Sequence, residues 1–549
     1  MRRFVFRVSA GAEIGVGHLA RCAHLARELQ ARGSDVVLLL DHLEDQFSPW
    51  LKDLESVPLY PNSVYSDQLR DARLSRTFVS NSTVIVDDYR LDETWERALK
   101  LTADGVVVID DLANRKHECD WLVDARWVGA KSASRYEELV PKSCKQLLGP
   151  EYCILSPAYT GIRDHQPTPK PVKIENINKQ VFNILLSIGG GGDLRTIAVL
   201  MEGFLSHPDL RDVVLFPVVG PASTNADVIE EIARNHERVR PVVGVTDLLP
   251  FYQAADLFIG SLGTAMAELN CVALPAITFA TTENQFNEQN FLDDLGHYFH
   301  ITRDEIEDVD ALVELVIRMR SEWQRVLSLS CNALIRVDGN GTKRVANQLF
   351  EVEESPKGEG SSLHFEALQA GESEATEVWR PKADVLIRPV VDRDINHYLL
   401  SRNLSKNRRN MTDQTEIGCL EHYKWWFSNN RFSYVLSDAR EPMLYIWHER
   451  KSYLGRNYMV GGWFVCSDDC GFDLAALALK WQLDLCARLF PDANWLAVIS
   501  KQNRFVNLLN RQVGFTPMGN RDPDLIAAQN FFPAATEEYF DFLRYDQPR

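Results

Sequence analysis

The segment that decides the fold is FVFRVSAGAEIGVGH, residues 4–18. Residues 4–8 have the composition of a buried strand, and an amphipathic pattern typical of a helix begins near His18 and stops at Gly33. A glycine-rich turn from strand to helix exposes backbone N–H groups and directs the positive end of the helix dipole at an anion, commonly phosphate. Gly17 lets a ligand approach the backbone, and His18 would face that ligand. A purely structural glycine turn, with the histidine bonded locally, is the alternative.

Strand-like apolar runs alternate with helical patterns over two successive stretches of the chain. The first stretch contains VVLLL, TVIVDD, VVVIDD and WLVDA, at residues 36–40, 83–88, 106–111 and 121–125. The second contains FNILLSIGGGGD, VVLFPVVG, ADLFIGS and LPAITFA, at residues 182–193, 213–220, 255–261 and 274–280. This alternation predicts parallel sheets covered by helices on both faces. Two such domains in tandem predict a ligand crevice outside the carboxyl ends of their strands.

Composition divides the chain into three folded pieces, with a weaker break at residues 160–179, which contain three prolines and no hydrophobic period, and a stronger break further on. Residues 351–378, EVEESPKGEGSSLHFEALQAGESEATEV, are rich in Glu, Ser and Gly, which predicts a flexible linker. In the last piece, closely spaced strands precede an Ala/Leu-rich helix at residues 472–489, which is an α+β pattern. We therefore expect an α/β protein with Rossmann-like domains at residues 1–165 and 180–350, a linker at 351–380 and an α+β domain at 381–545.

Charge and cysteine usage exclude several functional classes. The chain carries 59 Lys and Arg against 77 Asp and Glu, a net charge of −18, which would repel nucleic acid. The only dense basic run, residues 406–409, has the length of an ordinary surface patch. Ten cysteines occur singly, so neither a metal site nor a disulfide framework is expected. No apolar stretch is long enough to span a membrane, and the first residues lack a signal-peptide core. We expect a cytoplasmic protein without membrane insertion.

Eight phrases spread over residues 1–350 resemble one enzyme family in the same order. They are GAEIGVGHLARC, VDDYRLD, VVIDDLANRKHECDWLVDA, LLGPEYCILSPAY, LLSIGGGGD, ADLFIGSLGTAMAELNCVALPAI, ENQ and DGNGTKR. Together they resemble the UDP-2,4-diacetamido-2,4,6-trideoxy-β-L-altropyranose hydrolases of pseudaminic acid biosynthesis. The resemblance implies a GT-B-like arrangement of the two Rossmann-like domains. It also implies inverting hydrolysis of a UDP-sugar, without a cofactor, to UDP and a free sugar destined for surface or flagellar glycans.

The resemblance further assigns roles to individual residues. His18 matches the family's proposed general base, a common role of histidine at neutral pH, and Tyr89 matches its active-site tyrosine. The implied substrate-binding residues are Gly17, Arg21, Asp88, Asn284 and Gln285, and the implied UDP-binding residues are Gly189, Gly190, Gly191, Ser261, Thr264 and Glu268, the last of these on the ribose hydroxyls. Asp87 and Asp88 are both candidate polar anchors, although either could cap the next helix. Ser156 and Met266 replace an arginine and a tryptophan of the family, which leaves the sugar open.

Residues 384–545 resemble a GNAT-type N-acetyltransferase, the fold that acetylates the 4-amino sugar one step earlier in the same pathway. The likeness lies in LIRPVVDRDINHYLLSRN, EHYKWWF and NRFVNLLNRQVGF, and it implies an acetyl-CoA site that includes Phe464, Val465, Gly471 and Asn503. Two features depart from the fold. The carboxylates of Asp468 and Asp473 would repel a pyrophosphate, and Asn510 stands where a tyrosine acid is common. The domain is therefore either an acetyltransferase or a degenerate sugar-binding or scaffolding domain.

Three functions remain open at this stage. The leading hypothesis is a UDP-sugar hydrolase fused to a GNAT-like domain, with sugar N-acetylation left open as a second activity and association with other enzymes of its pathway left open as well. The second is a glycosyltransferase that uses a related UDP-sugar donor. The third is a non-catalytic protein that binds sugar nucleotides.

Overall fold

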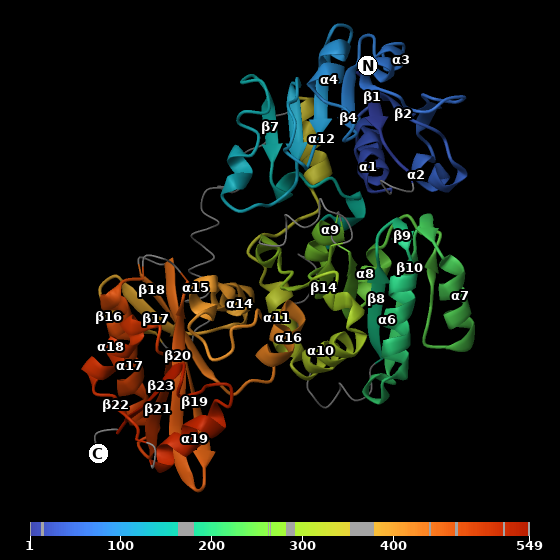
Figure 1. Ribbon diagram of the computed structural model, residues 1–549. Coiled ribbons are helices and arrows are strands. Elements are labelled where there is room, and N and C mark those ends of the chain that lie inside the picture. The colour runs from blue at the N-terminus through green and yellow to red at the C-terminus, as the bar shows by residue number, and fades with distance from the viewer. Residues whose placement is uncertain are drawn as a thin grey trace. The chain divides into compact units, whose positions relative to one another are not determined.

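The structure is a computed structural model that describes residues 2–11, 16–162, 181–261, 263, 265–280, 291–351, 378–438, 441–466, 470–519 and 522–546 (Figure 1). It divides into two compact units, Met1–His364 and Phe365–Arg549, which are described separately. Among the helices in these ranges, none combines the length and apolar character needed to cross a bilayer.

The first unit begins with an N-terminal domain built on a seven-stranded parallel sheet of order β3-β2-β1-β4-β5-β6-β7. Its strands are β1 (Arg3–Val8), β2 (Asp35–Leu40), β3 (Glu55–Pro58), β4 (Thr83–Asp87), β5 (Gly105–Ile109), β6 (Trp121–Asp124) and β7 (Lys145–Leu148). Its helices are α1 (Gly17–Ala31), α2 (Ser48–Leu51), α3 (Gln68–Ser75) and α4 (Glu93–Lys100). Because side chains alternate along a strand, Phe4 and Phe6 of β1 pack on the α1 face whereas Val5 packs on the α4 face.

A middle domain follows in the same unit, on a six-stranded sheet of order β12-β10-β8-β13-β14-β15 whose pairs are all parallel. These strands are β8 (Phe182–Ser187), β10 (Val213–Val219), β12 (Val242–Val243), β13 (Leu257–Ser261), β14 (Ala276–Phe279) and β15 (Phe299–Ile301). A separate short pair consists of β9 (Gly191–Asp193) and β11 (Ala222–Thr224). The helices are α6 (Arg195–Ser206), α7 (Ala226–Asn235), α8 (Leu249–Ala254), α9 (Ala265–Val272), α10 (Val309–Ser321) and α11 (Trp323–Cys331).

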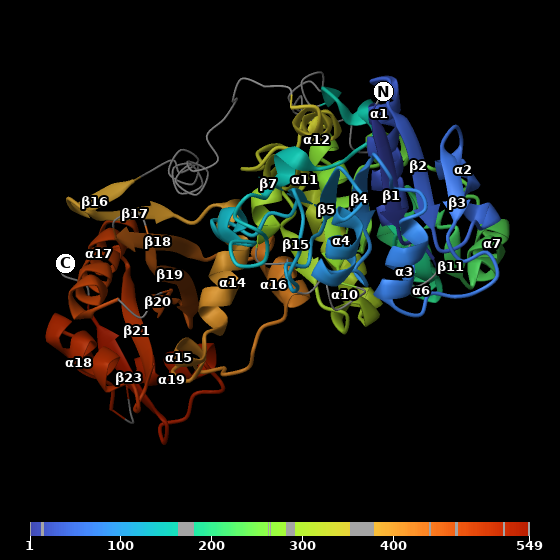
Figure 2. The same cartoon turned by 90° about the horizontal axis from the view of Figure 1, so that it is seen from above.

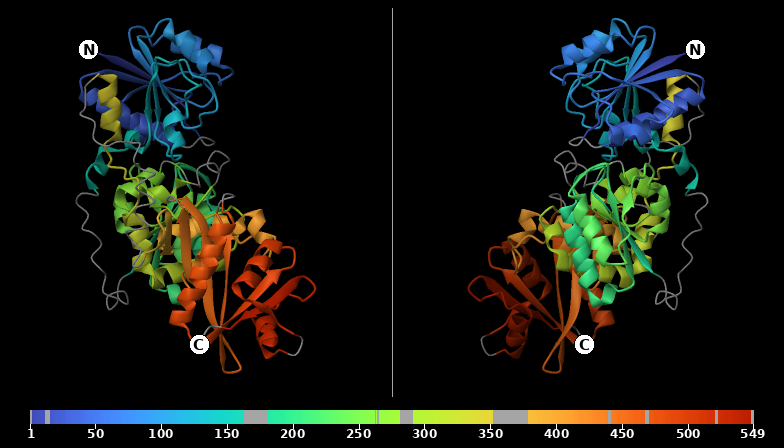
Figure 3. Two further views of the ribbon diagram at one scale, coloured as in Figure 1. Left: turned by 90° about the vertical axis from the view of Figure 1, so that its left-hand side faces the viewer. Right: turned by 90° about the vertical axis from the view of Figure 1, so that its right-hand side faces the viewer.

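The chain returns to the N-terminal domain at the end of the first unit. Helix α12 (Gly341–Leu349) lies beside α1, and its Val345 and Leu349 join the core cluster of Phe4 and Phe6 (Figure 3). The predicted domain boundary at residue 350 groups this helix with the middle domain, whereas its apolar side chains pack in the core of the N-terminal domain. Tyr159 is the converse case: it precedes the predicted end of the N-terminal domain at residue 165, but its side chain packs in the core of the middle domain. The two crossing segments are joined where Thr342 Oγ1 donates to the carbonyl of Leu155 at 2.7 Å.

The second unit is built on an eight-stranded mixed sheet of order β16-β17-β18-β19-β20-β21-β23-β22. Its strands are β16 (Trp379–Lys382), β17 (Val385–Pro389), β18 (Phe432–Asp438), β19 (Glu441–Tyr453), β20 (Arg456–Val465), β21 (Ala493–Ser500), β22 (Thr516–Pro517) and β23 (Phe540–Tyr545). Its helices are α14 (Ile395–Asn403), α15 (Ser405–Arg408), α16 (Cys419–Trp426), α17 (Phe472–Leu489), α18 (Arg504–Val513) and α19 (Pro523–Phe531). Helix α17 packs on one face of the sheet, α14 and α19 pack on the other, and α16 packs against α14 (Figure 2).

The mixed sheet agrees with the predicted α+β pattern, because strands β17 to β20 are antiparallel neighbours and α17 connects β20 to the parallel strand β21. Most of the predicted linker, 351–380, lies outside the described residues. At its end, β16 already begins at Trp379, two residues before the predicted start of the domain. The likeness to GNAT-type acetyltransferases remains a prediction.

Candidate functional site

Each parallel sheet of the first unit has one point at which the order of its strands reverses. In the N-terminal domain this point lies between β1 and β4, and in the middle domain it lies between β8 and β13. Ligands of open α/β sheets bind in the crevice outside the carboxyl ends of the strands at such a point. His18 follows β1 in the first turn of α1, Asp87 ends β4, and Ser261 ends β13. The predicted site residues thus come from both reversal points.

His18 is held by a carboxylate that comes from the neighbouring strand. Its Nδ1 lies 2.5 Å from Oδ1 of Asp87, whose side chain is completely buried. Burial alone would raise the pKa of Asp87, but the Arg21 guanidinium and His18 outweigh it and hold that pKa well below its usual range. An ionised carboxylate only accepts hydrogen bonds, so Nδ1 of His18 carries the proton and donates it. In the described part of the chain, no group lies within hydrogen-bond distance of Nε2 of His18, which is left with a free lone pair.

Arg21 ties this pair to a second carboxylate. Its Nε donates to Oδ2 of Asp87 at 2.6 Å, and its Nη1 donates to Oδ2 of Asp111 at 3.1 Å. Both acceptors are protein carboxylates, so Arg21 holds the charged groups of the site together, and the substrate contact predicted for it stays a prediction. Asp111 follows β5, and sequence reasoning did not select it. The signal that could have identified it is its place directly after a buried strand in VVVIDD.

Tyr89 lies against His18 and is oriented by Asp111. The two rings make an edge contact with centroids 4.6 Å apart, and the Tyr89 hydroxyl donates to Oδ1 of Asp111. Burial and the negative charge of Asp111 raise the pKa of Tyr89 far above its usual range, so the phenol keeps its proton. Because that proton points at Asp111, the lone pairs of the phenol oxygen can accept a hydrogen bond from another group.

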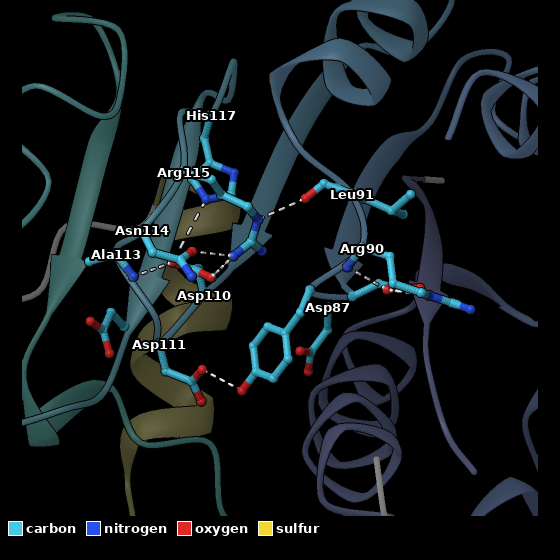
Figure 4. A network of polar contacts seen from close by, with 12 residues as sticks. Asp87, Arg90, Leu91, Asp110, Asp111, Ala113, Asn114, Arg115 and His117 are labelled. Atoms are coloured by element: carbon cyan, nitrogen blue, oxygen red, sulfur yellow. Dashed lines mark hydrogen bonds and ion pairs between the residues drawn. The ribbon is translucent and has the colours of Figure 1, made fainter. Parts of the chain in front are cut away.

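The loop that carries Asp111 is fixed by its neighbour Asp110. Oδ1 of Asp110 accepts from Nη1 of Arg115 at 2.8 Å, and Oδ2 accepts from the backbone N–H of Ala113 at 2.9 Å (Figure 4). Arg115 in turn donates through Nε to the carbonyl of Leu91, in the loop that follows β4. The ends of β4 and β5 are therefore joined independently of Tyr89.

Asp88 lies on the other side of its strand from Asp87. Its carboxylate accepts from Nε and Nη2 of Arg90 and from the backbone N–H of Arg90, and it lies 3.7 Å from Nη2 of Arg7. Asp88 is buried in this ion network and stabilises the turn. The structure therefore brings Asp87 to His18, whereas Asp88, which was predicted to bind substrate, makes its contacts elsewhere.

The predicted UDP-binding glycines form a tight turn beside the loop that precedes α1. Gly189 has φ +89°, and a Cβ on Gly190 would lie 2.5 Å from Cγ2 of Val16, which immediately precedes Gly17 and α1. Only a residue without a side chain allows the two loops to approach this closely. Ser261 is buried at the end of β13, and a Cβ on Gly189 would lie 3.9 Å from its Oγ. The third glycine, Gly191, begins β9.

Glu268 lies in α9, the helix that follows β13. Its Oε2 accepts from the hydroxyl of Tyr252 at 3.1 Å, a partner that sequence reasoning missed. Burial raises the pKa of Glu268 to about 7, and the negative charge of Asp247 adds to the shift whereas the Tyr252 hydrogen bond opposes it. The carboxyl group therefore changes charge near neutral pH. Three further predicted residues, Thr264, Asn284 and Gln285, lie outside the described residues.

In the second unit, β20 and β21 diverge. They pair in parallel only from Asn457 to Val460 on β20 and from Ala493 to Leu496 on β21, although both strands continue further. A cavity of about 880 Å³ is lined by the residues just beyond the paired stretch, including Trp463 and Ala497. Diverging strand ends expose backbone N–H and C=O groups that can pair with an extended, amide-containing ligand.

The residues predicted for acetyl-CoA divide into two groups. Phe464, Val465 and Asn503 line the cavity, whereas Gly471 precedes α17 and is exposed. The N–H of Val465 donates to Oδ1 of Asn407 at 3.1 Å and its carbonyl accepts from Nδ2 of Asn407 at 2.8 Å. Asn503 caps α18 by accepting the N–H of Val506. The N–H of Val465 is thus already used, so a ligand could accept from it only by displacing Asn407, whereas the carbonyl oxygen keeps a second lone pair.

The described residues contain no group of three or more His, Cys, Asp and Glu side chains that could hold a metal ion.

No family model matches the chain. It is 22% identical over 353 residues to the spore coat polysaccharide biosynthesis protein SpsG of Bacillus subtilis. That alignment covers 63% of this chain and 96% of SpsG. It is 20% identical over 238 residues to the UDP-2,4-diacetamido-2,4,6-trideoxy-beta-L-altropyranose hydrolase of Campylobacter jejuni. That alignment covers 43% of this chain and 77% of the hydrolase. Both alignments are longer than any single domain of the first unit.

Two solved structures are similar in part. MurG from Acinetobacter baumannii has a TM-score of 0.43 and 15% identity over 64% of this chain and all of that chain. The UDP-bound MnaA of S. aureus has a TM-score of 0.41 and 12% identity over 66% of this chain and all of that chain. At these TM-scores neither likeness supports an argument about this protein.

Proposed function

We propose that the first unit hydrolyses a UDP-activated 2,4-diacetamido-2,4,6-trideoxy sugar to UDP and the free sugar, in the biosynthesis of nonulosonic acids such as pseudaminic acid. The observation that carries the proposal is the His18–Asp87 pair at the strand reversal point, with Nε2 of His18 free to accept a proton. The partial similarity to a hydrolase of this name supports the same choice of substrate.

The site provides a base and an orienting acceptor for one water molecule. Nε2 of His18 accepts one hydrogen bond from the water, and the phenol oxygen of Tyr89 accepts the other, because its own proton is committed to Asp111. A water that donates both protons directs its lone pair away from both acceptors, toward the anomeric carbon. As the new C–O bond forms, His18 takes the proton and Asp87 stabilises the resulting imidazolium. Asp87 and Asp111 are positioning residues in this scheme.

The middle domain supports departure of UDP. As the bond between the anomeric carbon and the phosphate oxygen breaks, its electron pair passes to the β-phosphate of UDP. The backbone around Gly189 and Gly190 offers N–H groups to the pyrophosphate, as glycine-rich loops commonly do. Glu268, with Tyr252 beside it, accepts hydrogen bonds from the ribose hydroxyls. These steps use the chain's own residues throughout.

The test is product analysis with the UDP-sugar alone, without an acceptor or acetyl-CoA. We expect equimolar UDP and free sugar, and NMR of the first product should show the anomer opposite to that of the substrate. A glycosyltransferase would release UDP only after an acceptor is added. A binding protein would retain UDP-sugar without turnover, and either result would overturn the hydrolase.

A second activity is favoured by the cavity of the second unit. We propose that acetyl-CoA binds between the diverging ends of β20 and β21, where Phe464 and Asn503 line the cavity. Its acetyl group is then transferred to the amine of an amino sugar, which forms an amide and releases coenzyme A as the thiol. Calorimetric titration of the whole protein with acetyl-CoA tests this, with coenzyme A free of the acetyl group as the control. Micromolar binding supports an acetyltransferase. Absence of binding leaves the alternative, a degenerate sugar-binding or scaffolding domain.

The protein's environment follows from the same proposal. A UDP-sugar and acetyl-CoA are both cytoplasmic metabolites, so we infer a cytoplasmic enzyme that works beside other enzymes of the sugar pathway.

A further inference from the structure

Two cysteine thiols lie together at the amino ends of strands β6 and β7, whereas the candidate site lies at the carboxyl ends of the strands of the same sheet. Sγ of Cys119 and Sγ of Cys144 are 3.5 Å apart, although the residues are separated by 25 positions in the sequence. We propose that Cys119 and Cys144 form a redox-active dithiol, which a low-molecular-weight disulfide converts to an intramolecular disulfide bond. The sequence alone indicated ten isolated thiols that serve as small apolar side chains.

The backbone already holds the two cysteines at the required separation. Cys119 comes just before β6 and Cys144 just before β7, and these strands are parallel neighbours that begin with Trp121 paired to Lys145. The N–H of Lys145 donates to the carbonyl of Asp120 at 2.9 Å, which fixes the two strand entries side by side. In this register Asp120 stands opposite Cys144, so Cys119 is offset by one residue along the neighbouring strand. A strand spacing of about 4.8 Å and a rise of about 3.3 Å per residue give a Cα separation of about 6 Å, within the range that disulfides span. The sulfurs, which are 3.5 Å apart, have about 1.5 Å left to close to reach the length of a disulfide bond.

The two thiols differ in access and in acidity. Cys119 is only 1% exposed, whereas Cys144 is half-buried and can be reached from solvent. The hydrogen bond from Cys119 lowers the pKa of Cys144, and the positive charges of Lys100 and His117 lower it further, while burial and Asp120 oppose the shift. The same hydrogen bond, together with burial, raises the pKa of Cys119. Thiol–disulfide exchange begins with the more accessible thiolate, so Cys144 attacks first.

The exchange proceeds in two balanced steps. The Cys144 thiolate attacks one sulfur of the external disulfide RSSR, which forms a mixed disulfide and releases RS⁻. Cys119 then gives its proton to the released thiolate and attacks the Cys144 sulfur, which forms the Cys119–Cys144 bond and releases a second RS⁻. The second RS⁻ takes up a proton from solvent, which replaces the one that Cys144 released when it ionised. The protein therefore loses two hydrogens in total, and RSSR is reduced to two thiols.

The experiment is exposure of the whole protein to oxidised glutathione, followed by alkylation, trypsin digestion and mass spectrometry. Residues 117–126 and 143–145 are separate tryptic peptides with one cysteine each. We expect the wild type to yield these peptides linked and two hydrogens lighter, and a thiol reductant should separate them. Cys119→Ser should stop at a glutathione adduct on Cys144, whereas Cys144→Ser should leave Cys119 reduced.

Cys466 and Cys470 provide the matched control. They are four residues apart and Cys470 influences Cys466 through charge, but among the described residues no sulfur–sulfur hydrogen bond is found between them like the one between Cys119 and Cys144. They should remain unlinked under conditions that link Cys119 to Cys144. The proposal is overturned if wild-type Cys144 accumulates a stable glutathione adduct, or if both thiols of the pair remain alkylated as free cysteines while surface thiols react.

Discussion

Nδ1 of His18 lies 2.5 Å from Oδ1 of Asp87, although 69 residues separate them in the sequence. The contact forms because β1 and β4 are adjacent parallel strands, and α1 begins just past the end of β1. Asp87 is completely buried and also bonded to Arg21, so the ring orientation is fixed by the sheet itself. The proton on Nδ1 leaves Nε2 as the base.

Replacing Asp87 with Asn should therefore reduce turnover more than binding. We expect kcat for UDP release to fall about 100-fold or more, because an amide cannot stabilise the imidazolium, with UDP affinity changed less than about threefold. Steady-state kinetics and UDP titration measure the two effects. Glu28→Gln, which removes a carboxylate paired to Arg32 on the same helix, serves as the control. Equal losses in kcat and in UDP affinity would show that Asp87 acts only through the fold.

UDP affinity should depend on pH through Glu268. Burial raises the pKa of Glu268 to about 7, so the carboxylate that accepts ribose hydroxyls is mostly protonated at pH 6.5 and mostly ionised at pH 8.5. UDP affinity should therefore increase as the pH rises, and Kd for UDP should fall about fourfold between pH 6.5 and pH 8.5. Glu268→Gln should bind UDP more weakly and lose that pH dependence. If the variant keeps the wild-type slope, another group is responsible.

The close approach of two glycine-containing loops can be tested by adding one carbon atom. A Cβ on Gly190 would lie 2.5 Å from Cγ2 of Val16, so Gly190→Ala should separate the loops and weaken UDP binding about tenfold. Val16→Ala removes Cγ2 and should restore most of the affinity when combined with it. Calorimetric titration of the two single variants and the double variant measures the effect. A double variant as weak as Gly190→Ala would contradict the contact as the cause.

His448 should make the second unit sensitive to acid. Its ring is fully buried between Phe432 and Tyr434, neither nitrogen has a hydrogen-bond partner among the described residues, and burial lowers its pKa to about 4. The unfolded chain has the higher pKa and binds the proton first, so stability is full above pH 6.5 and falls as the pH drops toward 4. Between pH 7.5 and 5.5 this amounts to about 1.3 kcal/mol.

The measurement is urea unfolding of the wild type and of His448→Phe at these two pH values. Phenylalanine keeps the aromatic packing without a titratable nitrogen, so the variant should lose about 1.3 kcal/mol less on acidification. Identical losses in the two proteins would mean that other groups account for the acid sensitivity.

The long buried strands were predictable because an apolar run of five or six residues is typical of a strand that is covered on both faces. The strand before the glycine turn and the Ala/Leu-rich helix α17 were both predicted from their apolar residues, whereas the order of the strands in the two sheets was not. Short strands were missed, since β3 and β7 contain few apolar residues and gain their pairing from neighbours. The return of α12 to the first domain was also missed, because an amphipathic pattern shows that a face is buried but not against what.

The site was predictable in its residue types more than in its contacts. His18 and Tyr89 were selected and do lie together. Asp88 was chosen for the substrate, yet side-chain alternation along β4 directs Asp87 to the α1 face and Asp88 to the opposite face. That alternation is readable in VIVDD, but the sequence does not say which face carries the ligand. Asp111 could be recognised only from the structure, because the pairing of β4 with β5 is what brings it to the hydroxyl of Tyr89.

The measurement that tests the central claim most directly is acceptor-free release of UDP from the UDP-diacetamido-trideoxy sugar by the wild type and by His18→Ala. UDP affinity is titrated in parallel for both proteins. The account predicts sustained release by the wild type, a loss of about 1,000-fold or more in kcat for the variant, and similar UDP affinity in the two. Release by His18→Ala at the wild-type rate would show that His18 is not the base.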